Sequence, residues 1–267
     1  ILEEAKQLAE QGIKELIIIA QDTTKYGMDL YGESKLAELL EEISKIEGIQ
    51  WIRFLYAYPE GITDELIEVV ANNSKIAKYF DIPIQHISDS MLKKMNRRTS
   101  KKQIQELIQK IKGKIPNVTL RTSLIVGFPG ETKEDFEELL ALVRQVKFDK
   151  LGTFMYSKEE GTPAAKLPKQ IHGNTKKARY RQIMALQQQI SRENLEKKLN
   201  QECEVLIENI SFDGKYYVGR TRQDVPEMDG LVYIKKEPLD RTDRRNHFVT
   251  CKIVGMSDYD LVAEIID

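Results

Sequence analysis

The segment from Arg121 to Thr132, RTSLIVGFPGET, joins a strand-like run to a turn that is suited to contacting a ligand. Gly127 and Gly130 flank Phe-Pro, and glycine lets a bound group approach the backbone closely. Thr132 followed by Asp135 is typical of a helix N-terminus, whose free N–H groups favour negative charge. The pattern is neither Gly-x-x-x-x-Gly-Lys nor Gly-x-Gly-x-x-Gly, so it predicts a small polar ligand of modest charge rather than a polyphosphate. A purely structural tight turn is the alternative.

Polar side chains follow two other apolar runs. Gln21 and Asp22 come directly after the run that ends at Ala20, and Gln85 and His86 follow another. In parallel βα folds the ligand site lies at the carboxyl ends of the strands, which makes these residues candidates for ligand contacts. For Asp22, closing a turn is an equally good interpretation.

The residue types that bind metals are too scattered to predict a metal site. His86, His172 and His247 have no second histidine or cysteine nearby in the sequence. Cys203 and Cys251 are far apart, lie in strand-like runs and form no Cys-x-x-Cys motif. We therefore expect reduced, buried thiols, and we name no metal ligand and no catalytic side chain.

A basic run, KKMNRRTSKK, occupies residues 93–102 and contains six Lys or Arg. The simpler interpretation is a solvated helix face and loop. The alternative is a contact with an anion or a nucleic acid at the rim of the site, with Arg97 the residue of most interest.

The elements that must position these residues alternate between two periodicities. Strand-like apolar runs occur at 15–20, 51–57, 79–85, 118–127 and 150–157. Helical periodicity occurs at 1–12, 34–46, 63–72, 89–95, 100–111 and 133–146. This alternation predicts an α/β fold with a parallel sheet. Periodicity alone does not choose among a full barrel, a partial barrel and an open sheet.

The alternation of predicted strands and helices ends after residue 157. A long amphipathic helix is predicted at 174–200. Short strand candidates then follow at 203–209, 215–221, 230–234, 248–254 and 261–266. Five short strands in so few residues predict a small closed barrel.

Charge divides the chain at about the same place. Residues 201–267 carry 14 acidic and 9 basic residues, whereas residues 1–200 carry 28 and 32. We therefore expect one domain at 1–200 and a second at 201–267. The acidic second domain is poorly suited by charge to bind RNA phosphates.

No stretch is suited to a membrane or to secretion. The longest apolar run, 16–20, is far too short to span a bilayer, and no signal peptide is present, so we expect a cytoplasmic protein without a membrane partner. The chain opens with Ile1 in a helical pattern, and we expect its true start, and one preceding strand, to lie upstream.

Three stretches together resemble the radical S-adenosylmethionine methylthiotransferases: TSLIVGFPGET (122–132), IPIQHISDSMLKKMNR (82–97) and GTFMYSKEEGTPAA (152–165). The resemblance spans essentially the whole chain. It implies a partial parallel (β/α) barrel of the radical SAM type over 1–200, ending in the long helix. It also implies a small antiparallel β-barrel, similar to a TRAM domain, over 201–267.

Two further stretches, AQDTTKYG (20–27) and DVPEMDG (224–230), resemble the RimO branch of that family. This branch methylthiolates the β-carbon of an aspartate on small-subunit ribosomal protein twelve. The other branch, which modifies a tRNA adenosine, is the alternative. An acidic module suits a basic ribosomal protein better than an RNA chain.

The resemblance implies S-adenosylmethionine, two [4Fe–4S] clusters and an electron donor. In the family, a Cys-x-x-x-Cys-x-x-Cys loop holds the first cluster, and a 5′-deoxyadenosyl radical takes a hydrogen from the aspartate before sulfur and methyl are added. Neither that loop nor the domain that holds the second cluster occurs in this sequence. We therefore expect a fragment that by itself builds no cluster and is inactive.

By position at strand ends, the resemblance implies a set of cofactor contacts. They are Gln21, Asp22, Gln85, Arg121, Ser123, Gly127, Phe154, Met155 and Tyr156. Arg121 and Ser123 share one face of their strand, and Arg121 is the candidate partner for the methionine carboxylate.

Overall fold

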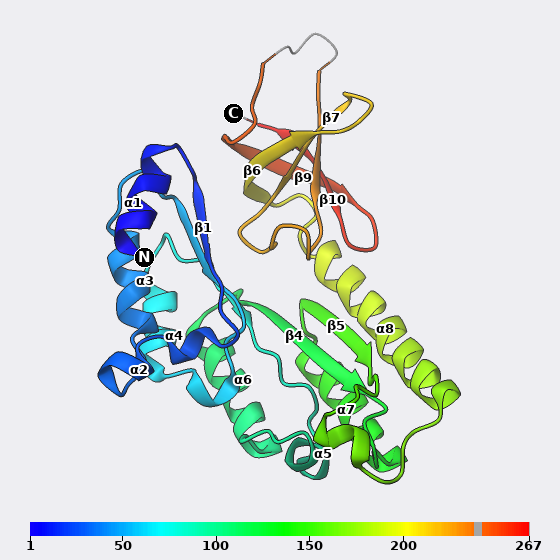
Figure 1. Cartoon of the computed structure of the whole chain (residues 1–267). Coiled ribbons are helices and arrows are strands. Elements are labelled where there is room, and N and C mark those ends of the chain that lie inside the picture. Colours follow the sequence, from blue (N-terminus) through cyan, green and yellow to red (C-terminus); the bar gives the residue numbers. More distant parts are fainter. Residues whose placement is uncertain (238–241, 267) are drawn as a thin grey trace.

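The computed structural model describes residues 1–237 and 242–266 (Figure 1). Its first five strands are β1 (Glu15–Ile18), β2 (Trp51–Phe54), β3 (Tyr79–Asp81), β4 (Thr119–Val126) and β5 (Lys150–Met155). Each predicted strand is present and ends one to four residues earlier than its apolar run. Tyr56 explains the early end of β2, because its positive φ angle turns the chain out of the sheet.

Helices separate the strands as predicted. They are α1 (Leu2–Glu10), α2 (Met28–Tyr31), α3 (Leu36–Ser44), α4 (Asp64–Asn72), α5 (Asp89–Lys94), α6 (Lys101–Lys114), α7 (Lys133–Val146) and α8 (Gly173–Glu196). Short 3₁₀ turns occur at η1 (Thr23–Lys25), η2 (Pro59–Gly61) and η3 (Pro163–Lys166). Thr132 with Asp135 forms the capping box expected at the start of α7, and the same spacing, Ser100 with Gln103, forms a capping box at the start of α6. The sequence did not reveal α2.

The first five strands form a parallel row in sequence order. β1 pairs with β2, and β4 lies between β3 and β5. A bridge between Ile52 and Ile76, with a hydrogen bond from the Ala57 amide to the Asp81 carbonyl, joins the two parts. The row curves (Figure 1), and the fold is the expected partial parallel (β/α) barrel, called here the half-barrel.

The main core lies between the convex face of this row and the helices. Its strand residues include Phe54, Phe80, Leu120, Leu124 and Val126, and its helix residues include Leu40, Ile67, Ile108 and Leu139. Burial of each such side chain contributes roughly 1.5–3 kcal/mol. The alternate residues of β4, including Arg121 and Ser123, therefore face the concave side.

The last five strands form a closed barrel, called here the module. They are β6 (Glu202–Ile210), β7 (Tyr216–Arg220), β8 (Val232–Lys235), β9 (Phe248–Met256) and β10 (Leu261–Ile265). One neighbouring pair, β8 and β10, runs parallel, so the expectation of an antiparallel barrel is correct for the other four pairs. A closed ring with an odd number of strands cannot alternate in direction throughout. Residue 267 of the predicted second domain lies outside the described residues.

The module packs against the amino ends of the half-barrel strands. The first residues of four strands contact it: Glu15 pairs with Arg220, Trp51 bonds to Glu204, Tyr79 bonds to Asp229 and Lys150 pairs with Asp224. Burial raises the pKa of Asp224, but Lys150 and Lys198 outweigh it and hold that pKa below its usual value. These buried contacts fix the module to one end of the half-barrel and leave the carboxyl ends of its strands open.

Among the residues that the structure describes, no helix combines the length and apolar character that a membrane crossing requires.

Candidate active site at the mouth of the half-barrel

The mouth is defined here as the carboxyl ends of β1–β5 and the segments that leave them. On its concave face, the sheet register places Ser123 opposite Gly152 and Ile125 opposite Phe154. The Gln85 amide donates to the Ser123 carbonyl at 2.9 Å, which puts Gln85 beside them. The structure therefore brings together three of the predicted cofactor contacts, Gln85, Ser123 and Phe154.

Gly152 places no side chain beneath the Phe154 ring. A Cβ atom there would stand 3.5 Å from the Phe154 ring, which leans over the glycine. The Phe154 side chain is nonetheless 60% exposed. An exposed aromatic ring beside a glycine, with a hydroxyl and an amide adjacent, is suited to a ligand that has a flat ring and polar groups. Sequence reasoning missed Gly152, although a glycine inside a strand is a recognised sign of close approach.

Two residues at the mouth hold unusual backbone conformations. Tyr56 has φ of 56° and Gln85 has φ of 67°, although neither is glycine. Both are fixed by hydrogen bonds, from the Tyr56 amide to Asp81 Oδ2 at 3.1 Å and from the Ile125 amide to the Gln85 carbonyl at 2.8 Å. Strained residues of this kind concentrate at ligand sites, which supports a binding role for this end of the half-barrel.

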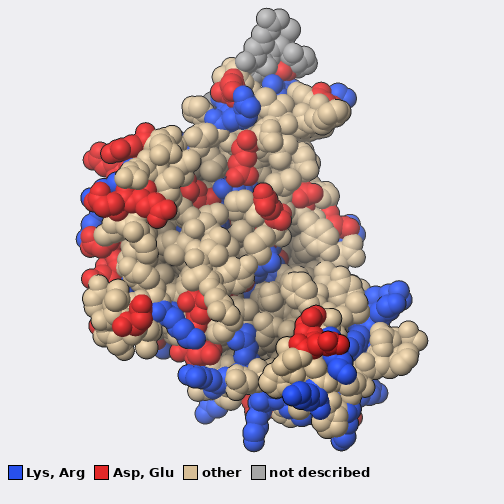
Figure 2. All heavy atoms as spheres, in the orientation of Figure 1, with Lys and Arg blue, Asp and Glu red and all other residues tan. Residues whose placement is uncertain are grey.

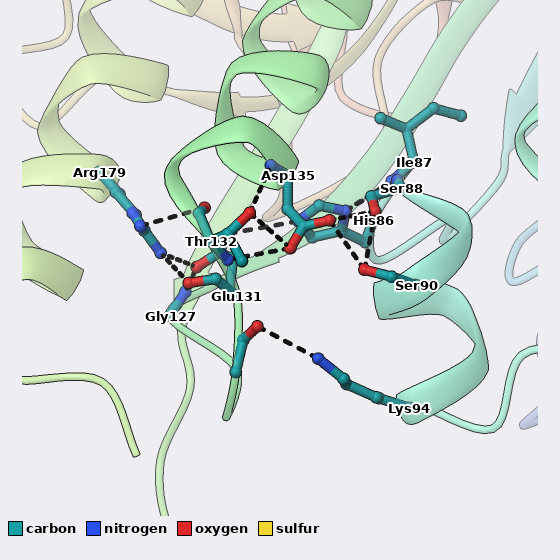
Figure 3. Close-up of polar contacts among 11 residues, drawn as sticks. His86, Ile87, Ser88, Ser90, Lys94, Gly127, Glu131, Thr132, Asp135 and Arg179 are labelled. Atoms are coloured by element: carbon teal, nitrogen blue, oxygen red, sulfur yellow. Dashed lines mark hydrogen bonds and ion pairs between the residues drawn. The ribbon is translucent and has the colours of Figure 1, made fainter. Parts of the chain in front are cut away.

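The turn after β4 is organised around Glu131, which the sequence analysis did not single out. Its buried carboxylate accepts hydrogen bonds from the Gly127 amide and from Arg179 Nη1 (Figure 3). His86 Nδ1 accepts from the amides of Ile87 and Ser88, so His86 Nε2 carries the proton and donates to Glu131 Oε1 at 3.2 Å. His86 is therefore structural, and Glu131 joins three segments that leave the strands.

Asp135 fixes the start of α7 in the same region. Its carboxylate accepts from the Thr132 amide and hydroxyl and from the hydroxyls of Ser88 and Ser90 (Figure 3). Burial raises the pKa of Asp135, but hydrogen bonds from Ser88, Thr132 and Ser90 outweigh it and lower this pKa to about 2. The carboxylate is thus charged under ordinary conditions and anchors α5 to α7.

The two glycines of the turn have positive φ, and lysine side chains lie against both. A Cβ at Gly127 would stand 2.4 Å from Lys176 Cγ, and one at Gly130 would stand 2.8 Å from Lys94 Nζ. Lys94 donates to the Gly130 carbonyl at 3.1 Å. The sequence predicted that a ligand approaches this backbone; in the structure the neighbours are the protein's own side chains. Gly127 as a cofactor contact stays a prediction.

The other predicted contacts are more dispersed. Gln21 is exposed beyond the end of β1, whereas Asp22 caps η1 through the Thr24 amide and hydroxyl. Asp22 therefore closes the turn, and its contact with a cofactor stays a prediction. Met155 alternates with Phe154 and lies on the other face of β5. The Tyr156 ring packs against Phe128 at 5.0 Å, and its buried hydroxyl has no hydrogen-bond partner among the described residues.

Arg121 does not lie free at the mouth. Its Nη1 is 2.8 Å from Asp229 Oδ1 of the module, and its Nε is 3.6 Å from Asp81 Oδ1. Asp229 also accepts from the Tyr79 hydroxyl at 2.7 Å. The role of Arg121 toward a cofactor stays a prediction, and the structure gives its guanidinium a different partner.

The residues present fit S-adenosylmethionine better than they fit an iron–sulfur cluster. The exposed Phe154, the open face at Gly152 and the polar groups of Ser123 and Gln85 suit an adenosine with a charged amino-acid tail. A [4Fe–4S] cluster needs thiolate ligands. The two cysteines of this chain, Cys203 and Cys251, lie opposite each other in β6 and β9 of the module.

The protonation state and burial of these two thiols also make them poor ligands for iron. Cys251 is buried and Cys203 is half-buried. Burial raises the pKa of Cys203 to about 11, so its thiolate form is scarce. No group of three potential metal ligands occurs within residues 1–237 and 242–266.

The sequence model of the Radical SAM superfamily matches residues 1–143, which is more than half of the chain. The chain belongs to the radical SAM superfamily. A TRAM domain model matches residues 201–266, where the structure has the module. Membership implies S-adenosylmethionine and [4Fe–4S] clusters in general.

The chain is similar along almost its whole length to curated proteins named ribosomal protein uS12 methylthiotransferase RimO. The protein of Alkaliphilus oremlandii is 60% identical over 265 residues, which is 99% of this chain and 60% of that protein. Those of Clostridium perfringens (strain SM101) and Acetivibrio thermocellus are 51% and 48% identical, and this chain covers 58% of each. The predicted resemblance to the RimO branch is confirmed. This radical SAM chain spans about three fifths of the length of these relatives.

A solved structure agrees on the fold. Coproporphyrinogen III oxidase (HemN) from Escherichia coli, a radical SAM enzyme, superposes with a TM-score of 0.51 at 16% identity, over 83% of this chain and 60% of that chain. At this identity the likeness concerns the radical SAM fold alone.

Proposed function

We propose that this chain forms the half-barrel and TRAM part of a radical SAM methylthiotransferase, which adds a methylthio group to the β-carbon of an aspartate of ribosomal protein uS12. The observation that carries the proposal is the 48–60% identity, over nearly the whole chain, to proteins named for that activity. We also propose that the chain divides into a radical SAM domain at residues 1–200 and a TRAM-like barrel at residues 201–267.

The residues at the mouth suit radical chemistry better than acid–base chemistry by a side chain. The β-carbon of an aspartate holds its hydrogens in bonds that a side-chain base removes poorly, so a positioned His or Glu is of little use. Bound S-adenosylmethionine would supply the radical that removes such a hydrogen. His86 and Glu131, the buried titratable groups at the turn, already bond to each other and to Arg179.

Four residues hold the cofactor in this proposal. Phe154 stacks on the adenine, and Gly152 leaves room for the ring. Ser123 and Gln85 bond to the polar groups of the nucleoside or its amino-acid tail. The strained backbone at Gln85 fixes the direction of its side chain before the cofactor binds, which lowers the entropic cost of binding.

The proposed enzyme also needs iron–sulfur clusters and an electron donor. The family resemblance implies two [4Fe–4S] clusters and an electron donor, and this chain's cysteines do not fit a cluster. The enzyme would work in the cytoplasm, where ribosomal proteins are made and assembled.

The test uses a full-length enzyme that contains this chain, a uS12 peptide and S-adenosylmethionine under anaerobic reducing conditions. The expected product is the peptide with one methylthio group in place of hydrogen on a single aspartate, found by tandem mass spectrometry. Phe154→Ala should weaken S-adenosylmethionine binding roughly tenfold, consistent with loss of one stacking contact of about 1–1.5 kcal/mol. Phe212→Ala, which removes an exposed ring from the module, is the matched control. Modification of a tRNA adenosine in place of the peptide would reject the proposal.

A further inference from the structure

Two basic segments that are distant in sequence meet at the mouth. Residues 93–102 contain six Lys or Arg and no Asp or Glu, and residues 158–181 contain seven Lys or Arg and two Glu. The turn after β4 joins them, because Lys94 Nζ donates to the Gly130 carbonyl at 3.1 Å and the Gly130 amide donates to the Lys169 carbonyl at 2.9 Å. The sequence predicted only the first of these segments.

Positive charge is concentrated at this end of the molecule. Figure 2 shows Lys and Arg gathered at its lower end, where Figure 1 places α5, α7 and the start of α8. Asp and Glu gather at the upper left, over α1 and α3. The whole chain carries a net charge of only −1, so this separation is a property of the fold.

Several of these cations are exposed and have no ion pair with any described residue. They are Lys93, Arg98, Lys158, Lys166 and Lys177, and we call them the basic rim. Elsewhere, exposed lysines are commonly neutralised, as in the pairs Lys45 with Glu42 and Lys110 with Asp64. A group of unpaired cations around an open site is a favourable place for a polyanion.

The module does not offset this charge at the mouth. It lies at the amino ends of the strands, and two of its acidic side chains are buried there against Lys150 and Arg121. The expectation that an acidic module attracts a basic protein therefore loses part of its support, since Asp224 and Asp229 are not on the surface. A free, positively charged ribosomal protein would be repelled by the basic rim.

We propose that the basic rim binds the phosphate backbone of RNA, so that the acceptor aspartate reaches the mouth from a protein that is already bound to RNA. The inference rests on the proposed function for the identity of the acceptor, but RNA binding by the rim can be measured without it. RNA phosphates beside the aspartate neutralise the rim and remove the repulsion between the two basic proteins. The substrate class is thus a ribosomal protein within a ribonucleoprotein particle.

The first test measures binding of a fluorescein-labelled RNA hairpin to the 267-residue chain by anisotropy at several salt concentrations. The variant Lys93→Ala, Arg98→Ala, Lys177→Ala should bind roughly a hundredfold more weakly at about 0.1 M salt, with a salt slope smaller by about 3. The control Lys215→Ala, Lys235→Ala, Lys252→Ala changes charge equally, but on the module, and should bind like the unmodified chain. Equal binding by the rim variant, or an equal loss in the control, overturns the proposal. Tighter binding of polyglutamate than of the RNA, at equal charge and equal salt, would indicate an acidic protein partner and also overturn it.

The second test separates this proposal from the proposed function. With a full-length enzyme, the rim variant should methylthiolate uS12 in isolated small ribosomal subunits at least about tenfold more slowly, while a short uS12 peptide should react at the unmodified rate or faster, because less positive charge then repels it. Unchanged rates on both substrates reject the rim proposal and leave the function standing. If the unmodified enzyme modifies neither substrate, the proposed function fails, and the RNA-binding result still decides whether the rim binds RNA.

Discussion

Arg121 and Asp229 lie 108 positions apart in the sequence and form a buried ion pair of 2.8 Å between the half-barrel and the module. Asp229 accepts in addition from the Tyr79 hydroxyl and the Val225 amide. Burial, and then the charge of Asp229, raises the pKa of Tyr79 well above its usual value, so this hydroxyl remains a donor. The pair fixes the module against strand residues that lie just below the proposed cofactor site.

Removal of Asp229 should loosen this contact. Asp229→Ala leaves the Arg121 guanidinium and the Tyr79 hydroxyl buried without their partner, and we expect a loss of about 3–5 kcal/mol in the free energy of unfolding. Replacing the ion pair with Arg121→Met and Asp229→Leu together should recover only part of that loss, because the guanidinium is no longer stranded but the buried Asp81 carboxylate loses its contact with Arg121. Urea unfolding followed by circular dichroism measures both. A loss below about 1 kcal/mol for Asp229→Ala would show that the contact is not formed in solution.

The cofactor role predicted for Arg121 can be separated from its structural one. Arg121→Ala in a full-length enzyme should weaken S-adenosylmethionine binding if the guanidinium meets the methionine carboxylate. Asp229→Ala serves as the comparison, since it disturbs the same interface but keeps Arg121. Calorimetric affinities that fall only for Arg121→Ala support direct contact. Unchanged cofactor binding in Arg121→Ala refutes it.

Local chemistry was readable from the sequence. Ser100 with Gln103 and Thr132 with Asp135 form the helix caps that their spacing predicts, because a capping box needs only residues within one turn. The strand-and-helix order and the closed small barrel also followed from periodicity. Partners across the fold were not readable: nothing near Asp229 in the sequence indicates Arg121, and nothing near Glu131 indicates Arg179. For the candidate site, Gln85, Ser123 and Phe154 were predicted from strand ends and their contact with a cofactor stays a prediction, whereas Gly152 needed the register of β4 with β5.

Gly127 should tolerate no side chain. Its φ of 73° disfavours any L residue by roughly 1–2 kcal/mol, and Lys176 Cγ occupies the space of a Cβ. We expect Gly127→Ala to lower the free energy of unfolding by about 2 kcal/mol. Adding Lys176→Ala should recover only the steric part. Gly173→Ala, at the start of α8 with open space around it, is the matched control and should be neutral or stabilising in the same thermal-unfolding assay.

Asp135 should produce a specific acid sensitivity. Its folded pKa is about 2 against an ordinary value of 3.8, so the bonds to Ser88, Ser90 and Thr132 stabilise the fold above about pH 4. That stability is lost as pH falls through 2, and it amounts to about 2 kcal/mol. Asp135→Asn should remove this part of the pH dependence when urea unfolding is compared between pH 5 and pH 2. An exposed control, Asp29→Asn, should retain it; identical pH profiles for Asp135→Asn and the unmodified chain would contradict the assignment.

The 267-residue chain should build no [4Fe–4S] cluster by itself. Cluster assembly requires several thiolates that converge on one site, and Cys203 and Cys251 face each other within the module with the pKa of Cys203 raised to about 11. Anaerobic reconstitution with iron and sulfide should leave no charge-transfer absorbance and no Mössbauer signal of a cubane after desalting. The variant Cys203→Ser, Cys251→Ser should give the same spectrum, which separates adventitious iron from thiolate binding. A stoichiometric cluster in the unmodified chain that is lost in this variant would show that the module's thiols bind iron, and it would overturn the assignment of cofactor chemistry to the mouth alone.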